Sequence, residues 1–294
     1  MIWKTRITEM MGTRYPIIMG AFAGLGRAVF AAPFSNAGGL GILTAINFRD
    51  VKRFEEELDK MNYLTNEPFG VNFTLAPPEL QRKNPKAPTE KTYMEYLDIA
   101  VEKGVKIFTT SAYQAKKLGR KIHDKNCYWF HKCATLEHAI SAEKAGADVI
   151  TIVGIEGTGF KNPLQNSTLV NITMAKRLLK TPIIAAGGIG DSRGFLAALA
   201  MGAEAVCFGT AIMATEECPA SKKFKERMIN QDIFDEEYYK QIYHHQLKDK
   251  SIWSMASGHI DEVVPMKKFI HDIIEGAEKI LNQWGFDNKE FSTL

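Results

Sequence analysis

The stretch of sequence that decides the fold is residues 182–210, which read PIIAAGGIGDSRGFLAALAMGAEAVCFGT. It starts with a short apolar run at 182–186, continues through an amphipathic segment at 193–201 and ends in a second apolar run at 205–208. Short runs rich in Val, Ile and Ala, joined by a segment long enough for a helix, are typical of parallel strands covered on both faces. The stretch is therefore predicted to form a strand, a helix and a second, parallel strand.

The same alternation of short apolar runs and amphipathic segments extends over almost the whole chain. The expected strands are residues 15–20, 40–45, 69–73, 106–109, 128–133, 149–153, 182–186 and 205–208. The expected helices are residues 27–35, 51–61, 93–103, 114–123, 136–145, 169–179, 193–201 and 266–284. Eight strands, each followed by a helical pattern, predict an α/β fold of the (β/α)8 TIM barrel type. A doubly wound open sheet is the main alternative, but it would place a phosphate-binding glycine turn after the first strand.

Two segments interrupt the alternation, and both follow predicted strands. Residues 74–90 are polar and rich in proline, which predicts a long loop. Residues 215–264 contain Phe, Tyr and Trp side chains in a proportion too high for a disordered linker. We therefore expect a helical cap inserted after strand 8, so that residues 1–214 and 265–294 form the barrel domain. Both insertions should lie over the C-terminal mouth, where barrels of this type place their chemistry.

Composition narrows the class of protein further. The formal net charge of +3 over 294 residues and the scattered basic side chains predict no nucleic-acid partner. No apolar run is long enough for a membrane span, and the N-terminus has no signal-peptide core. The four cysteines form no CxxC pair and have no His-rich partner segment, so neither zinc nor disulfides are expected. These features predict a cytoplasmic protein that acts on small molecules without metal or membrane, and self-association as a homo-oligomer stays open.

Two glycine turns carry the strongest chemical signal. Gly187 and Gly188 follow the seventh predicted strand, and Gly209 and Thr210 follow the eighth. Glycine lets backbone N–H groups approach an anion closely, and barrels often bind phosphate in the loops after strands 7 and 8. A lone Gly-Gly would indicate only a tight turn, but two such turns on successive strands favour a phosphate site.

At this point the sequence resembles a known family, the nitronate monooxygenase (2-nitropropane dioxygenase) family, which is related to flavin-dependent enoyl-acyl-carrier-protein reductases. The resemblance is carried by residues 15–20 (YPIIMG), 35–41 (SNAGGLG), 70–73 (GVNF), 145–148 (AGAD), 155–157 (IEG), 185–194 and 209–210. It spans nearly the whole predicted barrel, and the combination is much more specific than any single motif.

The resemblance implies FMN as the cofactor. By this resemblance the phosphate lies at the two glycine turns, and the backbone of Gly20, Ala21 and Phe22 lies against the edge of the isoalloxazine ring. Asn72 and Lys132 would contact the ring, and Gly154 and Gly157 would let the backbone approach it. A cation such as Lys132 stabilises the negative charge of a reduced flavin.

The resemblance also exposes two substitutions in the predicted substrate pocket. Val153 stands where the family usually has glutamine, and Phe160 stands where it has the histidine that serves as acid or base near the flavin. Phenylalanine cannot transfer a proton. Three explanations stay open: another residue serves as the acid, the reaction needs no acid, or the pocket has been converted to bind an apolar group. Glu156 and His259 are weak replacement candidates, and strand alternation should point His131 toward the helices if Lys132 faces the interior.

These features predict an FMN-dependent oxidoreductase that performs two-electron chemistry at flavin N5 on a small organic substrate. An NAD(P)H-dependent enoyl or quinone reductase is the rival enzyme, with NAD(P)H as electron donor. A flavin-binding carrier or sensor without turnover belongs to another class. A phosphate-ester barrel enzyme without flavin is a third alternative, but it would have no reason to keep Asn72 and Lys132. The sequence leaves the substrate, the choice of nicotinamide and the replacement for the histidine open.

Overall fold

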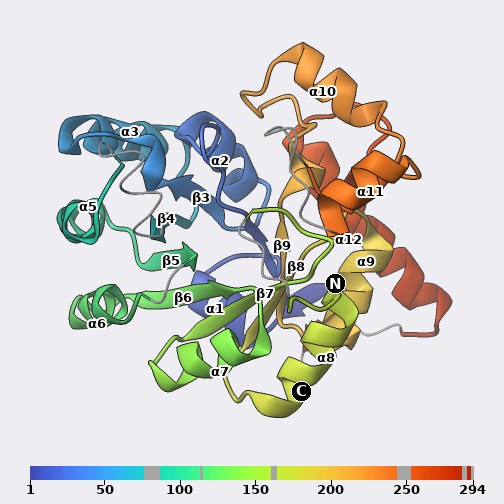
Figure 1. Ribbon diagram of the computed structural model, residues 1–294, viewed down its shortest axis with the longest axis horizontal. Helices are drawn as coiled ribbons and strands as arrows, with labels where there is room; N and C mark the ends of the chain where they lie inside the picture. The colour runs from blue at the N-terminus through green and yellow to red at the C-terminus, as the bar shows by residue number, and fades with distance from the viewer. Residues whose placement is uncertain (76–86, 113–114, 160–163, 244–252, 287–289, 293–294) are drawn as a thin grey trace.

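Eight parallel strands form the centre of the computed structural model, which describes residues 1–75, 87–112, 115–159, 164–243, 253–286 and 290–292 (Figure 1). The strands are β2 (Ile17–Met19), β3 (Gly41–Thr44), β4 (Phe69–Leu75), β5 (Ile107–Ala112), β6 (Tyr128–Cys133), β7 (Val149–Val153), β8 (Ile183–Ala186) and β9 (Ala205–Phe208). Their order in the sheet is β2-β9-β8-β7-β6-β5-β4-β3. A parallel bridge between Ile18 and Leu40 joins the two edges, so the sheet closes into the predicted barrel.

A ring of helices covers the outside of this barrel (Figure 1). These helices are α2 (Ala28–Asn36), α3 (Val51–Leu64), α5 (Glu90–Glu102), α6 (Lys116–Asp124), α7 (Leu136–Lys144), α8 (Thr168–Leu178), α9 (Ser192–Ala200) and α12 (Met266–Gln283). The C-terminal helix α12 packs against both α9 and α2, which completes the ring. The eightfold alternation predicted from the sequence is therefore confirmed, although the proline-rich part of the predicted loop, residues 76–86, lies outside the described residues.

Short polar side chains and glycines set the ends of these helices. Asp50 accepts a hydrogen bond from the N–H of Arg53 at the start of α3, and Asp191 does the same for Gly194 at the start of α9. Gly104, Gly146 and Gly202 follow α5, α7 and α9 with φ of 91°, 96° and 104°. These are left-handed conformations that glycine adopts at little cost, and they turn the chain back toward the next strand.

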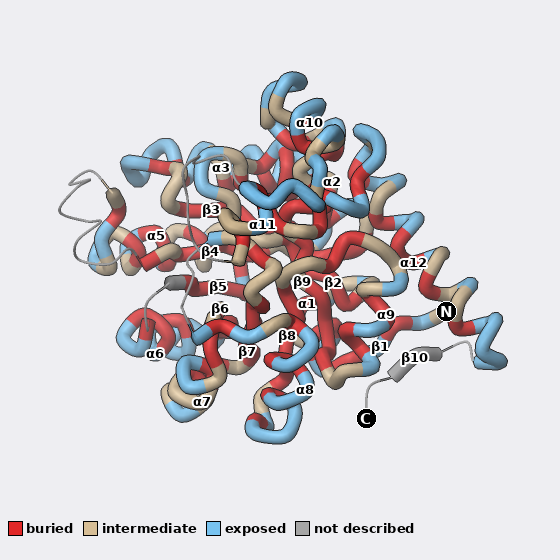
Figure 2. The backbone as a smooth tube through the Cα atoms, turned by 45° about the vertical axis from the view of Figure 1, so that its right-hand side comes forward, coloured by how far each residue is buried: buried red, intermediate tan, exposed pale blue. Residues whose placement is uncertain are grey.

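Strand alternation decides which side chains face the barrel interior. Phe73 of β4 stacks on Phe108 of β5 with ring centroids 5.7 Å apart and packs against Tyr93 of α5 at 5.0 Å. Phe73 therefore points outward, between the sheet and the helices, where buried side chains are concentrated (Figure 2). Because neighbours along a strand point to opposite faces, Asn72 and Thr74 point into the barrel.

An N-terminal unit that the sequence did not predict closes the amino-terminal end of the barrel. Strand β1 (Ile2–Lys4) pairs in parallel with β10 (Glu290–Ser292), and helix α1 (Arg6–Met11) follows β1. Ile7 and Met11 of α1 are buried. The guanidinium group of Arg6 forms an ion pair with Glu204, which immediately precedes β9 and is 2% exposed. The carboxyl ends of the parallel strands form the opposite end of the barrel, the mouth.

The chain between β9 and α12 forms the predicted helical cap. It contains α10 (Lys222–Ile229), α11 (Glu236–Tyr243) and the 3-10 helix η3 (Met255–His259), which follow the 3-10 helix η2 (Thr210–Ile212). We call its described residues, 215–243 and 253–264, the cap. Its small core contains Met228, Tyr238, Ile242, Trp253 and Ile260. A parallel bridge between Thr215 and Val264 holds its two ends together, and the division into separate barrel and cap domains stays a prediction.

None of the helices in the described part of the chain is both long and apolar enough to cross a membrane.

Candidate functional site

The predicted site residues come from strand ends that meet at one mouth. Gly20 follows β2, Lys132 lies near the end of β6, Gly154 follows β7, Gly187 follows β8 and Gly209 follows β9. All of these strands are parallel neighbours in one closed sheet, so their carboxyl ends lie at the same end of the barrel. The mouth is therefore where the structure brings the sequence-predicted residues together.

The glycine turns after β7 and β8 pack backbone against backbone. The N–H of Gly154 donates to the carbonyl of Ala186 at 2.9 Å, and Gly157 donates to Gly154 at 2.9 Å. A Cβ atom on Gly187 would lie 3.1 Å from the nitrogen of Gly157, and one on Gly154 would lie 2.1 Å from Oγ1 of Thr168. These three glycines are thus required for the contact between the two turns, independently of any ligand.

Backbone donors without an acceptor among the described residues lie at the turns after β8 and β9. Gly188 has φ of 73°, and nothing lies within 4 Å of the position of a Cβ atom on Gly209. Within the described residues, no acceptor receives the N–H groups of Gly188, Gly209 or Thr210. Thr210 is only 4% exposed, so an unused donor there would carry a desolvation cost. Free N–H groups around an open position fit an anionic group such as a phosphate.

The side chain of Thr210 makes a contact that the sequence did not predict. Its Oγ1 accepts a hydrogen bond from the backbone N–H of Ser254, in the cap, at 2.8 Å. The hydroxyl proton of Thr210 is therefore not needed for that contact and can be donated elsewhere.

The loop after β2 is held by two polar residues that sequence reasoning missed. The N–H of Phe22 donates to Oγ1 of Thr44 at 2.9 Å. The amide of Asn47 donates to the carbonyls of Phe22 and Gly26 at 3.0 and 3.2 Å, and its Oδ1 accepts from Gly24 at 2.5 Å. The sequence signal that could have found them is their position: Thr44 ends the apolar strand β3, and Asn47 follows it closely. Together they fix the backbone that is predicted to face the ring.

Asn72 lies inside the barrel and is 2% exposed. Its Nδ2 donates to Oγ1 of Thr109 at 2.8 Å, and its Oδ1 accepts from Thr74 at 2.7 Å. Ser111 extends the network by donating to Thr74 at 3.3 Å. The amide oxygen of Asn72 has two acceptor sites and uses one of them for Thr74, so it could still accept a hydrogen bond from a flavin ring.

Lys132 and Cys207 are titratable groups that face the barrel interior. Phe208 packs outward on Phe269 of α12 at 5.4 Å, so its neighbour Cys207 points inward. Burial lowers the pKa of Lys132, and the charge of Cys207 opposes this shift. Burial raises the pKa of Cys207 to about 11, against the opposing effect of Lys132. Within the described residues no carboxylate pairs with Lys132, so none competes with an anionic ligand for this side chain.

His131 faces away from the site, as the alternation predicts. Its Nδ1 lies 2.7 Å from Oγ1 of Thr110, and its ring lies 5.8 Å from that of Trp129. Burial lowers the pKa of His131 to about 4, so the ring is neutral at physiological pH. It contributes to packing rather than to proton transfer.

The candidate replacement acids occupy structural positions. The carboxylate of Glu156 accepts hydrogen bonds from the N–H and Oγ1 of Thr168 at 2.9 and 3.0 Å. His259 is exposed, and it packs so close to Gly190 that a Cβ atom added to this glycine would lie 2.9 Å from Cβ of His259.

The predicted pocket residue Val153 is buried at the end of β7, where its carbonyl accepts a hydrogen bond from Gln165 at 2.8 Å. The predicted pocket residue Phe160 lies outside the described residues.

Within the described ranges, no cluster of His, Cys, Asp or Glu side chains could hold a metal ion.

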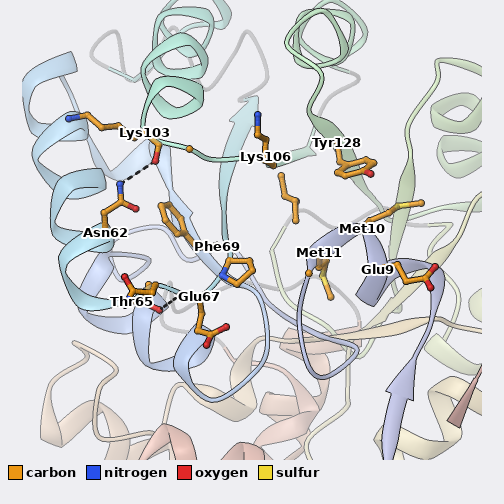
Figure 3. A pocket seen from close by; sticks show the side chains of 15 residues that line it. Glu9, Met10, Met11, Asn62, Thr65, Glu67, Phe69, Lys103, Lys106 and Tyr128 are labelled. Carbon is orange, nitrogen blue, oxygen red and sulfur yellow. Dashed lines mark hydrogen bonds between the residues drawn. The ribbon is translucent and has the colours of Figure 1, made fainter. Parts of the chain in front are cut away.

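A cavity of about 600 Å³ opens at the other end of the barrel (Figure 3). It is lined by α1 and by the amino-terminal ends of β4, β5 and β6, including Glu9, Phe69, Lys106 and Tyr128. Lys103 beside it is already paired with Asp59 at 2.6 Å. We do not assign the reaction to this cavity because barrel enzymes place their chemistry at the carboxyl ends of the strands, where the free donors lie.

Comparison with known proteins identifies the family and the fold of the chain. The sequence profile described as nitronate monooxygenase matches residues 4–243. A probable nitronate monooxygenase from Staphylococcus aureus (strain MSSA476) is 30% identical, with 77% of this chain and 72% of that protein covered. The solved structure of FabK from Thermotoga maritima is 26% identical, with a TM-score of 0.81 and coverage of 96% of this chain and 98% of FabK. A nitroalkane oxidase from Streptomyces ansochromogenes, at 19% identity and a TM-score of 0.77 over 94% and 99% of the two chains, shares the fold.

Proposed function

The chain belongs to the nitronate monooxygenase family, and from this premise we propose that it binds FMN and oxidises nitronates without the family's usual histidine. The coarser statement, that it is a flavin-dependent oxidoreductase of this family, follows from its membership. FMN, the chemistry at N5 and the choice of substrate are the parts that we propose.

The observation that carries the choice of FMN is the set of unused N–H donors at Gly188, Gly209 and Thr210. A terminal phosphate offers three strong acceptor oxygens to such donors, and the open position at Gly209 leaves room for it. The chain has no second nucleotide-binding fingerprint of the kind that FAD would need. These features support FMN.

The remaining residues of the mouth suit the ring of the cofactor. When bound, FMN supplies two-electron transfer at its N5 atom. The ammonium group of Lys132 would stabilise negative charge on the pyrimidine side of the reduced ring. Thr44 and Asn47 fix the loop that contains Gly20, Ala21 and Phe22, so the backbone can lie against the ring without rearrangement. A fixed backbone lowers the entropy cost of binding.

A nitronate fits the proton-transfer groups of the mouth better than its neutral nitroalkane. Glu156 is engaged by Thr168, and His131 points to the outside of the barrel. Within the described residues, neither group is placed to remove a proton from a substrate at the mouth. A nitronate has already lost that proton and carries negative charge, which the ammonium group of Lys132 would attract. We therefore propose that this enzyme uses the preformed anion.

Anaerobic mixing followed by visible spectroscopy tests this function. The purified protein is mixed with a nitronate, with NADH and with NADPH, each separately. We expect the nitronate alone to bleach the flavin band. Bleaching only by a nicotinamide would replace our proposal with the NAD(P)H-dependent enoyl or quinone reductase, and bleaching by none of them would favour a carrier or sensor.

We also propose that the protein is cytoplasmic. All four cysteines are free thiols, as expected for a reducing compartment, which supports a cytoplasmic location. Self-association into a homo-oligomer stays a prediction that sedimentation or light scattering can test.

A further inference from the structure

The cap and the proposed phosphate site share one residue, Thr210. This residue begins η2 directly after β9, and its backbone N–H is one of the unused donors. Its hydroxyl oxygen accepts the N–H of Ser254 at 2.8 Å, and both residues are buried. Because a hydroxyl has a single proton, an accepted bond from the cap leaves that proton for an acceptor on the other side.

Ser254 is itself held in place by the core of the cap. The hydroxyl of Tyr238, on α11, lies 2.9 Å from the carbonyl oxygens of both Trp253 and Ser254, and 3.2 Å from Oγ of Ser257. Burial raises the pKa of Tyr238 to about 12, so the phenol keeps its proton and acts as a donor. The position of the Ser254 N–H thus depends on α11.

A second contact ties the same turn to the barrel. The N–H of Met255 donates to the carbonyl of Glu156, in the loop after β7, at 3.3 Å. The first turn of η3 therefore touches both the loop after β9 and the loop after β7.

We propose that the cap is coupled to the phosphate of the cofactor through the hydroxyl of Thr210, with Ser254 and Tyr238 as positioning residues. The inference rests on the proposed binding of FMN. Donation from Ser254 orients the Thr210 proton toward the phosphate, and the phosphate in turn strengthens the bond that Thr210 accepts. Since coupling between two equilibria is reciprocal, the phosphate stabilises the contact between Ser254 and Thr210 as much as this contact stabilises the bound phosphate.

Riboflavin separates this coupling from ordinary flavin binding, because it has the same ring and lacks the phosphate. Dissociation constants of FMN and riboflavin are measured by flavin fluorescence on flavin-free protein. We expect Thr210→Val to weaken FMN about tenfold, the size of one hydrogen bond to a charged group, and to leave riboflavin unchanged. Thr210→Ser keeps the hydroxyl and should restore FMN affinity.

Tyr238→Phe tests the positioning role. It should weaken FMN several-fold without changing riboflavin, and it should add nothing in the Thr210→Val background, because both changes interrupt one chain of contacts. Tyr239→Phe is the matched control, since that exposed ring neighbours Tyr238 on α11 and packs on Tyr243. It should change neither affinity.

Amide hydrogen exchange tests the coupling in the opposite direction, that is, the effect of FMN on the cap. FMN should slow amide exchange at 253–260 in the wild type but not in Thr210→Val, and riboflavin should not slow it in either. Equal protection by both flavins, or equal loss of both affinities in Tyr238→Phe, would overturn the coupling while FMN binding stands. If neither flavin binds the wild type, the proposed function itself fails, and the inference fails with it.

Discussion

Glu156 receives two hydrogen bonds from Thr168, one from the backbone N–H at 2.9 Å and one from Oγ1 at 3.0 Å. Thr168 is the first residue of α8, and its hydroxyl also contacts the carbonyl of Gly187 at 2.9 Å. Both bonds end on Oε2, so this carboxylate oxygen is held at the junction of α8 with the glycine turns. This relationship argues against Glu156 as the acid that replaces the missing histidine.

Glu156→Gln should consequently act on stability more than on turnover. The amide keeps an acceptor but loses the charge that favours the start of a helix, so the free energy of unfolding should fall by about 1 kcal/mol. Urea denaturation of the reconstituted protein measures this, alongside kcat for a nitronate. A loss of kcat near a hundredfold at unchanged stability would return Glu156 to the catalytic residues.

Gly188→Ala should weaken FMN binding beyond its effect on folding. The new Cβ would lie 3.1 Å from Cβ of Glu156, at a residue whose φ is 73°. Gly104→Ala is the matched control, because Gly104 has φ of 91° and an open surrounding at the far end of the barrel. Both variants should lose about 1 kcal/mol of stability from the left-handed strain, measured by denaturation. Equal FMN affinity in the two variants would contradict the phosphate site.

Lys132→Met should stabilise the flavin-free protein near neutral pH. Burial holds the pKa of Lys132 below the ordinary value of 10.5, so the charged form costs stability in the folded state. Between its folded pKa and 10.5 the unfolded chain binds more protons, and the stability of the wild type rises with pH. The advantage of the variant, measured as Tm, should therefore shrink as the pH approaches 10.5.

The control for Lys132→Met is Lys225→Met. Lys225 is buried, and its Nζ donates to the carbonyls of Thr215 and Glu216 at 2.6 and 3.1 Å. Removing it leaves these carbonyls without their donor, so this variant should lower Tm. A fall in Tm in both variants would mean that Lys132 has a partner of its own.

Phe160→His should restore activity on neutral nitroalkanes. General-base catalysis contributes roughly 10²–10⁴-fold in rate, so the wild type should turn over a nitroalkane far more slowly than its nitronate. The variant should narrow this gap mainly by raising the nitroalkane rate, measured by oxygen consumption. Substantial wild-type activity on the nitroalkane, unchanged by the substitution, would show that another residue supplies the base.

Much of the fold could be predicted because its signals are local. The apolar runs and the glycines at 104, 146 and 202 mark strand and helix ends within a few residues of sequence. The pairing of β1 with β10 could not be predicted, because strands of three residues are too short to show the alternation of apolar and polar side chains, and these two lie at opposite ends of the chain. The inward orientation of Cys207 also depends on the register between strands, which a single strand does not reveal.

The residues of the candidate site that the sequence predicted are those with local signatures. They are glycines in turns that follow strands and a lysine near the end of a strand, and their contacts with a cofactor stay a prediction. The contacts of Asn47 with Phe22 and of Thr210 with Ser254 join residues that are distant in sequence. Hydrogen bonds of this kind form only when the folded barrel brings these residues together, so no local sequence pattern predicts them.

The measurement that tests the central claim most directly is the identity of whatever flavin the purified protein releases on heating. The account predicts close to one equivalent of FMN per chain, identified by chromatography and mass, either as isolated or after reconstitution. Release of FAD, or a colourless protein that takes up no FMN, would contradict it.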